Sequence, residues 1–335
     1  MSFDILTDGH AILNAASDEF DDWMHQAMQV RIRNFGKDLL CYSPTAYPYK
    51  IRNHEQSSLH NFPSLSVTGT SCSLKCEHCN GRLLTGMEPT LTPEVLFERC
   101  REIKSLGGEG VLISGGSDST GHVPLDHFGV TIRRVKQELD LRVVVHTGLV
   151  TPKTAHLLAE AQIDAAMLDI IGDADVAARV YHISEGPRKM RESLDILEEY
   201  DVPTVPHVLV GLDYGKLRGE IEALQILAQG KPSAIVIIAL SPVRKTPMEN
   251  VTPPTPDEIG RILTTARLGF QDIPVLLGCA RPKGQHKIDT DFFAVKSGMN
   301  GIALISQEGA DFARSLGLTP IFEDVCCSLA HLVFL

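Results

Sequence analysis

The sequence predicts an α/β fold: a (β/α)8 barrel of the TIM type with a helical N-terminal extension and a C-terminal tail. From residue 64 onward, short apolar runs alternate with longer amphipathic segments, which is the order of a parallel sheet covered by helices. The alternation repeats eight times, and eight such units can close into a barrel. An open doubly wound sheet is the alternative that fits the same alternation.

The expected strands and helices follow one another along the chain. The strands occupy residues 65–68, 110–114, 143–146, 165–170, 204–210, 234–240, 274–278 and 301–305. The helices occupy residues 93–106, 125–139, 152–161, 187–200, 217–228, 256–268 and 310–316. Several helices open with a threonine and a proline, a favoured pair at a helix N-terminus, as in Thr92-Pro93, Thr151-Pro152 and Thr255-Pro256.

The chain therefore divides into three expected parts. Residues 1–63 form the N-terminal extension, where apolar residues at helical spacing over 16–37 precede a turn-rich loop. Residues 64–318 form the barrel, and residues 319–335 form the tail with its pair of cysteines.

Charge and composition restrict the function classes. The formal net charge of −11 disfavours binding to nucleic acid or to an anionic membrane surface. No apolar run reaches the roughly 18–20 residues that span a bilayer, and the first residues lack the pattern of a secretory signal. We therefore expect a cytoplasmic protein whose eight cysteines are reactive or metal-bound thiols rather than disulfides.

A cysteine motif follows the first expected strand. Cys72, Cys76 and Cys79 have the spacing C-x3-C-x2-C, so their thiolates can converge from one loop, at the barrel face where chemistry is expected. Thiolates are the usual ligands of iron–sulfur clusters, and three of them leave one iron of a [4Fe–4S] cluster open. A zinc site with His78 as fourth ligand and three unrelated core cysteines are the alternatives.

The motif and its position resemble the radical S-adenosylmethionine (SAM) superfamily. The resemblance implies a [4Fe–4S] cluster on Cys72, Cys76 and Cys79 whose open iron chelates SAM. It also implies one-electron cleavage of SAM to a 5′-deoxyadenosyl radical that abstracts a hydrogen atom. An electron donor such as ferredoxin or flavodoxin is then expected as a partner.

Further positions fit this resemblance. Ser114, Gly115 and Gly116 end the second strand and resemble the family's Gly-Gly-Glu segment near the methionyl amino group, with Ser117 in place of the glutamate. A plain βα turn also explains these glycines.

Two more side chains are candidates for the SAM pocket. His78 takes the place of an aromatic residue near the adenine, and Asp169 resembles the strand-four acid near the SAM ribose or the substrate. The alternative for Asp169 is a helix cap.

Residues 20–320 are similar to the biotin synthase-like group, which has a helical N-terminal segment and a full eight-stranded barrel. Biotin synthase holds a second cluster with cysteines on strands two, three and five and an arginine on strand seven. Here His146 and His207 lie on strands three and five, and Arg281 alone fits, as a cofactor-binding residue. The chain is therefore not expected to be a biotin synthase.

Four cysteines remain for a second [4Fe–4S] cluster: Cys41, Cys279, Cys326 and Cys327. The alternative is that these four are ordinary buried thiols.

Residues 78–84, residues 278–282 and the Cys326-Cys327 pair resemble one component of the two-component lipoyl synthases. That resemblance implies a transferase of lipoate biosynthesis that inserts sulfur into a protein-bound octanoyl chain. Its partners would be a lipoyl carrier protein and a second radical SAM enzyme. Two alternatives remain open: a radical SAM isomerase or lyase with a single cluster and a small amino-acid-like substrate, and a non-enzymatic iron–sulfur sensor or assembly protein.

Overall fold

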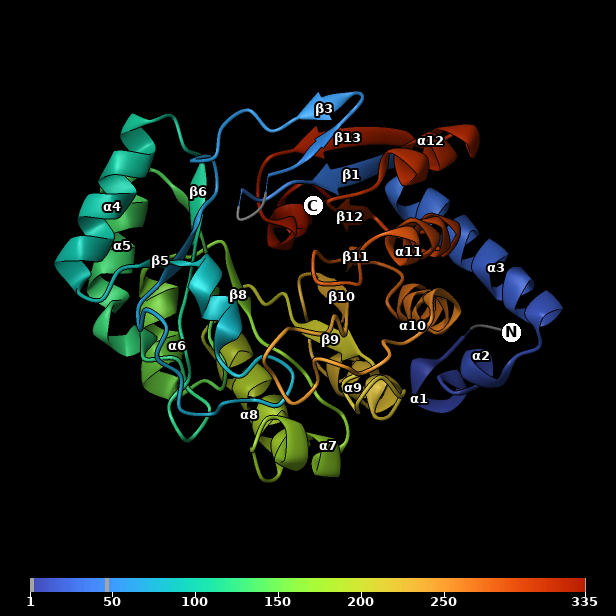
Figure 1. Ribbon diagram of the computed structural model, residues 1–335, viewed down its shortest axis with the longest axis horizontal. Coiled ribbons are helices and arrows are strands. Elements are labelled where there is room, and N and C mark those ends of the chain that lie inside the picture. Colours follow the sequence, from blue (N-terminus) through green and yellow to red (C-terminus); the bar gives the residue numbers. More distant parts are fainter. Residues whose placement is uncertain (1–2, 46–47, 335) are drawn as a thin grey trace.

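Parallel strands with helices outside them make up the computed structural model, which describes residues 3–45 and 48–334 (Figure 1). One sheet has six strands in the order β13 (Thr319–Glu323), β1 (Asp38–Tyr42), β12 (Gly301–Ala303), β11 (Val275–Leu277), β10 (Ile235–Ala239) and β9 (His207–Val210). The other has five in the order β5 (Glu88–Pro89), β4 (Ser64–Ser66), β6 (Gly110–Ser114), β7 (Arg142–His146) and β8 (Ala165–Met167). All eight expected strands are present and in barrel order, so the predicted α/β fold is confirmed.

The two sheets meet at one seam. Parallel bridges pair Ala166 with Thr204 and Asp169 with His207, which joins β8 to β9 and the residues before it. At the opposite seam, no ladder joins β13 to β4 or β5 among the described residues. A side chain spans that seam instead, since Asn61 Nδ2 donates to the Asp324 carbonyl oxygen at 3.0 Å. The strand order is that of a (β/α)8 barrel, but its ladder is open at this seam.

Two strands come from segments that were expected to lie outside the barrel. β1 belongs to residues 1–63 and β13 to residues 319–335, and β1 pairs in parallel with both β12 and β13. β13 tolerates Pro320 because it is an edge strand, where one side of the backbone needs no partner. Residues 1 and 335, the outer limits of the expected parts, lie outside the described residues.

The helices agree with the expected pattern. Those predicted are α3 (Ser17–Phe35), α4 (Pro93–Ser105), α5 (Gly129–Leu139), α6 (Pro152–Glu160), α8 (Gly186–Glu199), α9 (Glu220–Ala228), α10 (Pro256–Gly269) and α12 (Gln307–Ser315). Those not predicted are α1 (Ile5–Asp8), α2 (Ala11–Asn14), α7 (Ala174–Val180) and α11 (Gln285–Lys296). A hairpin of β2 (Lys50–Ile51) and β3 (His54–Glu55) and the 3-10 helices η1 (Arg82–Gly86) and η2 (Leu125–His127) complete these elements.

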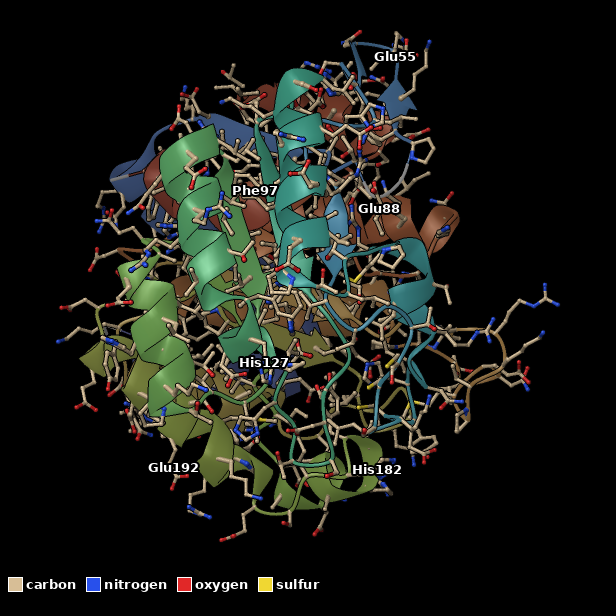
Figure 2. The ribbon with its side chains drawn as sticks, turned by 90° about the vertical axis from the view of Figure 1, so that its left-hand side faces the viewer. Glu55, Glu88, Phe97, His127, His182 and Glu192 are labelled. Carbon is tan, nitrogen blue, oxygen red and sulfur yellow. The ribbon has the colours of Figure 1, made fainter. Side chains whose placement is uncertain are left out.

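Side chains account for the start and the packing of these helices. At the start of α10, Thr255 accepts a hydrogen bond from the Glu258 backbone, and the Glu258 side chain accepts one from the Thr255 backbone. The Arg134 guanidinium of α5 covers the Phe97 ring of α4 at 4.0 Å. Phe97 is labelled in Figure 2, on the outer face of the molecule. None of the described helices is long and apolar enough to cross a bilayer.

A segment that follows β13 fills the inside of the barrel. This interior segment, residues 325–332, includes the 3-10 helix η3 (Cys327–Leu332), which contacts β8 and β12. Its apolar residues are buried in one cluster with inward-facing strand residues: Val325, Cys326, Cys327, Leu329 and Ala330 pack with Leu40, Tyr42, Val144, Met167, Val236 and Leu276. Just beyond the segment, Phe334 meets the Phe35 ring edge-on at 5.5 Å between centroids.

Candidate active site

The cysteine loop follows β4 and is fastened at both ends by hydrogen bonds. Ser73 N–H donates to the Ser117 carbonyl at 2.7 Å, and Glu77 N–H donates to the Val180 carbonyl at 2.9 Å. The loop is therefore held between the exit of β6 and the end of α7. This places the loop at the C-terminal ends of the strands, where barrel enzymes carry their chemistry.

The three thiols of the motif lie close together on this loop. Cys76 is buried, while Cys72 and Cys79 are half-buried. A hydrogen bond between the Cys76 and Cys79 sulfurs lowers the pKa of Cys79 and raises that of Cys76, and the charge of Cys72 raises the pKa of Cys76 further. The three predicted ligands therefore lie on one fastened loop, and their binding of a cluster stays a prediction.

The glycine pair after β6 packs against this loop. A Cβ atom on Gly116 would lie 1.9 Å from the Ser71 carbonyl oxygen and 2.5 Å from Cys72 Cβ. Gly116 N–H also donates to Thr68 Oγ1 at 2.6 Å. The backbone at Gly116 therefore packs directly against the cysteine loop, with no room for a side chain.

Ser114 precedes the glycines and has a different role. Its Oγ donates to the His146 carbonyl at 3.0 Å, so its side chain fastens β6 to β7. The predicted contact of this segment with SAM stays a prediction.

A chain of contacts leads from the cysteine loop into the barrel. The His78 ring stacks on Tyr181 with centroids 5.0 Å apart, and His78 Nδ1 is buried without a hydrogen-bond partner among the described residues. Tyr181 Oη donates to Asp169 Oδ2 at 2.8 Å. Asp169 is therefore directed toward the barrel centre, and its predicted contact with the SAM ribose stays a prediction.

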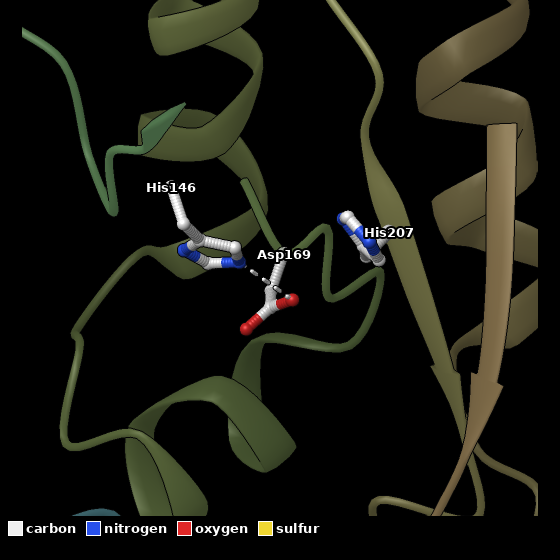
Figure 3. A group of neighbouring side chains, drawn as sticks. All are labelled: His146, Asp169 and His207. Carbon is white, nitrogen blue, oxygen red and sulfur yellow. Dashed lines mark ion pairs between the residues drawn. The ribbon is translucent and has the colours of Figure 1, made fainter. Parts of the chain in front are cut away.

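Asp169 lies between two histidines from neighbouring strands, His146 at the end of β7 and His207 at the start of β9 (Figure 3). His146 Nε2 is 3.6 Å from Asp169 Oδ1, and one side-chain nitrogen or oxygen of each residue lies within 4.8 Å of the others. His207 Nδ1 is buried without a hydrogen-bond partner in the described part of the chain. We call these three residues the central triad.

The protonation preferences of the central triad follow from burial and mutual charge. Burial opposes ionisation of Asp169, but the contact and charge of His146 outweigh it and lower the pKa of the carboxyl. Burial opposes protonation of His146, yet Asp169 raises the pKa of its imidazole. Burial and the charge of His146 lower the pKa of His207 to about 4. The charge of His146 therefore favours the ionised form of Asp169, while burial favours the neutral form of His207.

Two of the four cysteines proposed for a second cluster face the barrel interior. Cys326 and Cys327 are buried in the interior segment, where a hydrogen bond between them lowers the pKa of Cys326. Cys279 follows β11 and is exposed; desolvation by neighbouring atoms and the charge of Cys326 raise the pKa of its thiol.

Two predicted site residues lie elsewhere. Cys41 belongs to the core outside the barrel rather than to the interior cluster, because strand alternation directs it away from its inward-facing neighbours Leu40 and Tyr42. Arg281 forms a fully buried ion pair with Asp291 at 2.7 Å and donates to the Gly278 carbonyl, and its predicted contact with a cofactor stays a prediction.

Sequence reasoning missed Tyr181 and gave no role to His146 and His207. The two histidines carried a signal, since both lie on expected strands of the barrel whose side chains meet inside it. Tyr181 carried none, because it follows a helix that was not predicted.

Comparison with known proteins identifies similar chains. Residues 66–218 match the family model described as Radical SAM superfamily. A biotin synthase of Ruthia magnifica subsp. Calyptogena magnifica is 23% identical over 78% of this chain and 82% of its own length. Another, of Synechococcus sp. (strain CC9605), is 26% identical over 65% of this chain and 67% of its own.

Two solved structures share the fold over nearly the whole chain. A crystal structure of methylornithine synthase has a TM-score of 0.68 at 16% identity and covers 99% of this chain and 97% of its own. The FeFe-hydrogenase maturase HydG from Carboxydothermus hydrogenoformans has a TM-score of 0.66 at 15% identity and covers 95% of this chain and 76% of its own. At these identities the likeness establishes the fold alone.

Proposed function

The chain belongs to the radical SAM superfamily through its domain at residues 66–218, in the biotin synthase-like group, and we propose that it inserts sulfur into a substrate carbon. The observation that carries the proposal is the position of two thiol groups. Cys72, Cys76 and Cys79 lie on the loop after β4, whereas Cys326 and Cys327 are buried inside the same barrel. Cys279 completes the second set: it is exposed after β11, where the charge of Cys326 affects its pKa.

The cysteine loop suits a [4Fe–4S] cluster. Its three thiols supply three ligands, which leaves one iron open for SAM. When bound, the cluster and SAM supply one-electron chemistry that removes a hydrogen atom from the substrate. The chain's own contribution is to hold the three sulfurs on a fastened loop and to keep the Gly115–Gly116 wall free of side chains. The stacked rings of His78 and Tyr181 offer a flat surface beside the loop.

We propose that the second set of thiols holds the cluster that gives up sulfide. Because Cys41 lies outside the barrel, this set has three protein thiols instead of four. The substrate proposed is an octanoyl chain on a lipoyl carrier protein, with a second radical SAM enzyme completing the reaction and ferredoxin or flavodoxin supplying electrons. The biotin synthases among the relatives support sulfur insertion as the class of reaction.

Iron and sulfide counts test the two-cluster proposal. Anaerobically reconstituted wild-type protein should hold about eight irons and cleave SAM reductively, and an octanoyl carrier peptide should gain the mass of one sulfur. The Cys72/Cys76/Cys79→Ala variant should keep about half of the iron and release no 5′-deoxyadenosine. Adding Cys326→Ser and Cys327→Ser should remove the remaining iron. Release of 5′-deoxyadenosine by the triple variant would refute the assignment of the first cluster.

One observation favours a second candidate, a radical SAM isomerase or lyase acting on a small amino-acid-like substrate. The central triad places two imidazoles and a carboxylate inside the barrel, and such polar side chains suit amino and carboxylate groups better than methylene groups. Wild-type protein that holds only four irons, cleaves SAM and leaves the octanoyl peptide unchanged would favour this candidate.

A further inference from the structure

We propose that His146, Asp169 and His207 bind one divalent transition-metal ion, separate from the cysteine-held clusters. Two imidazoles and one carboxylate are a recurrent ligand set for iron(II), and the same groups also bind zinc. The three ligands come from three adjacent positions around the barrel, at the end of β7, just after β8 and at the start of β9.

The separation between His146 and Asp169 favours a shared ion over a hydrogen bond. A hydrogen bond between a ring nitrogen and a carboxylate oxygen spans about 2.7–3.2 Å, whereas His146 Nε2 and Asp169 Oδ1 are 3.6 Å apart. Two ligands at about 2.1 Å from one ion, at a tetrahedral angle, lie about 3.4 Å apart. The widest separation between the ligand atoms of the central triad is at most 4.8 Å.

Two further observations point to a ligand at this place. His207 Nδ1 is buried with no hydrogen-bond partner among the described residues, a costly state that is explained if its ring is oriented for a ligand. Asp169 Oδ2 accepts a hydrogen bond from Tyr181, so Oδ1 is the oxygen directed at His146 (Figure 3). Ligating carboxylates in proteins are fixed by such outer hydrogen bonds.

Cobalt(II) titration of the full-length Cys72/Cys76/Cys79→Ser variant tests this proposal apart from the radical reaction, because that variant cannot hold the first cluster. Under anaerobic conditions it should bind one Co²⁺ per chain, with visible d–d bands stronger than those of the aqueous ion. In this background His146→Gln, His207→Gln and Asp169→Asn should each weaken Co²⁺ binding at least tenfold. Tyr181→Phe should weaken it about 10- to 100-fold by releasing the carboxylate.

His127→Gln is the matched control. His127 is a histidine of η2 at the molecular surface, with 73% of its side chain exposed (Figure 2), and its replacement should leave the Co²⁺ affinity unchanged. Far-UV circular dichroism checks that each variant is folded, and Co²⁺ should raise the thermal midpoint of the background variant but not of its His207→Gln derivative. Co²⁺ affinity in the His146→Gln and His207→Gln variants equal to that of the background variant would overturn the proposal. So would binding that is lost only after Cys326→Ser and Cys327→Ser, since the ion would then be held by thiols.

Discussion

Gly116→Ala is expected to damage the cysteine loop through a single added methyl group. The new Cβ would lie 1.9 Å from the Ser71 carbonyl oxygen, which is about 1.1 Å short of the 3.0 Å that real Cβ contacts respect. Its other near neighbours are the Cβ and Cα of Cys72, so no flexible side chain can give way. Overpacking of this kind costs about 1–3 kcal/mol, and we expect about 3 kcal/mol because backbone must move.

Urea unfolding and iron binding measure the two consequences. The Gly116→Ala protein should lose about 3 kcal/mol of unfolding free energy and should take up less iron during anaerobic reconstitution, because Cys72 is displaced. Gly86→Ala is the control, since a Cβ on Gly86 meets nothing within 4 Å, and its effect should stay within about 0.5 kcal/mol. If both variants unfold alike and bind iron as the wild type does, the glycine is not needed for close packing and the reasoning fails.

Three further predictions concern stability. Asp291→Ala should lower the free energy of unfolding in urea by about 3–5 kcal/mol because it leaves the buried Arg281 guanidinium without its ion-pair partner. An added Arg281→Met should recover much of that free energy. A loss below about 1 kcal/mol in Asp291→Ala would contradict this prediction. Burial raises the pKa of Glu220 to about 7, whereas the ordinary value is 4.5. Between these two pH values the folded state holds a proton that the unfolded state has lost. The contribution of Glu220 to wild-type stability should therefore fall as pH rises from about 4.5 to 7. Glu220→Gln should remove that part of the fall when unfolding is measured at both pH values, and an unchanged pH dependence would contradict the assignment. Thr255→Ala should cost about 1 kcal/mol by removing the α10 cap, and an unchanged urea midpoint would show that the capping box adds nothing.

The barrel strands could be predicted from the sequence because their buried runs are apolar and are separated by amphipathic helices. β1 was missed although Leu39, Leu40 and Cys41 are apolar, because nearby prolines indicated a turn-rich loop. α11 was missed because its buried face includes Thr290 and Asp291, which weakens the apolar period.

The cysteine loop is the part of the site that local sequence specifies, since three ligands within eight residues can converge without help from the rest of the chain. The partner of Arg281 and the direction of Cys41 depend on packing between distant segments. The central triad joins residues from three strands, so only the assembled barrel reveals it.

The interior segment has a consequence for how the protein folds. β1 pairs with β12 and β13, which come from the other end of the chain. Its backbone hydrogen-bonding groups therefore stay unpaired until those strands have been synthesised. Residues 325–332 are synthesised after every strand that they pack against. The interior of the barrel therefore stays unpacked while the earlier units are being synthesised. Pairings this distant in sequence slow folding and prolong exposure of apolar surface. We therefore expect incompletely synthesised chains to depend on chaperones. We also expect cluster insertion to follow the pairing of β1 with β12 and β13.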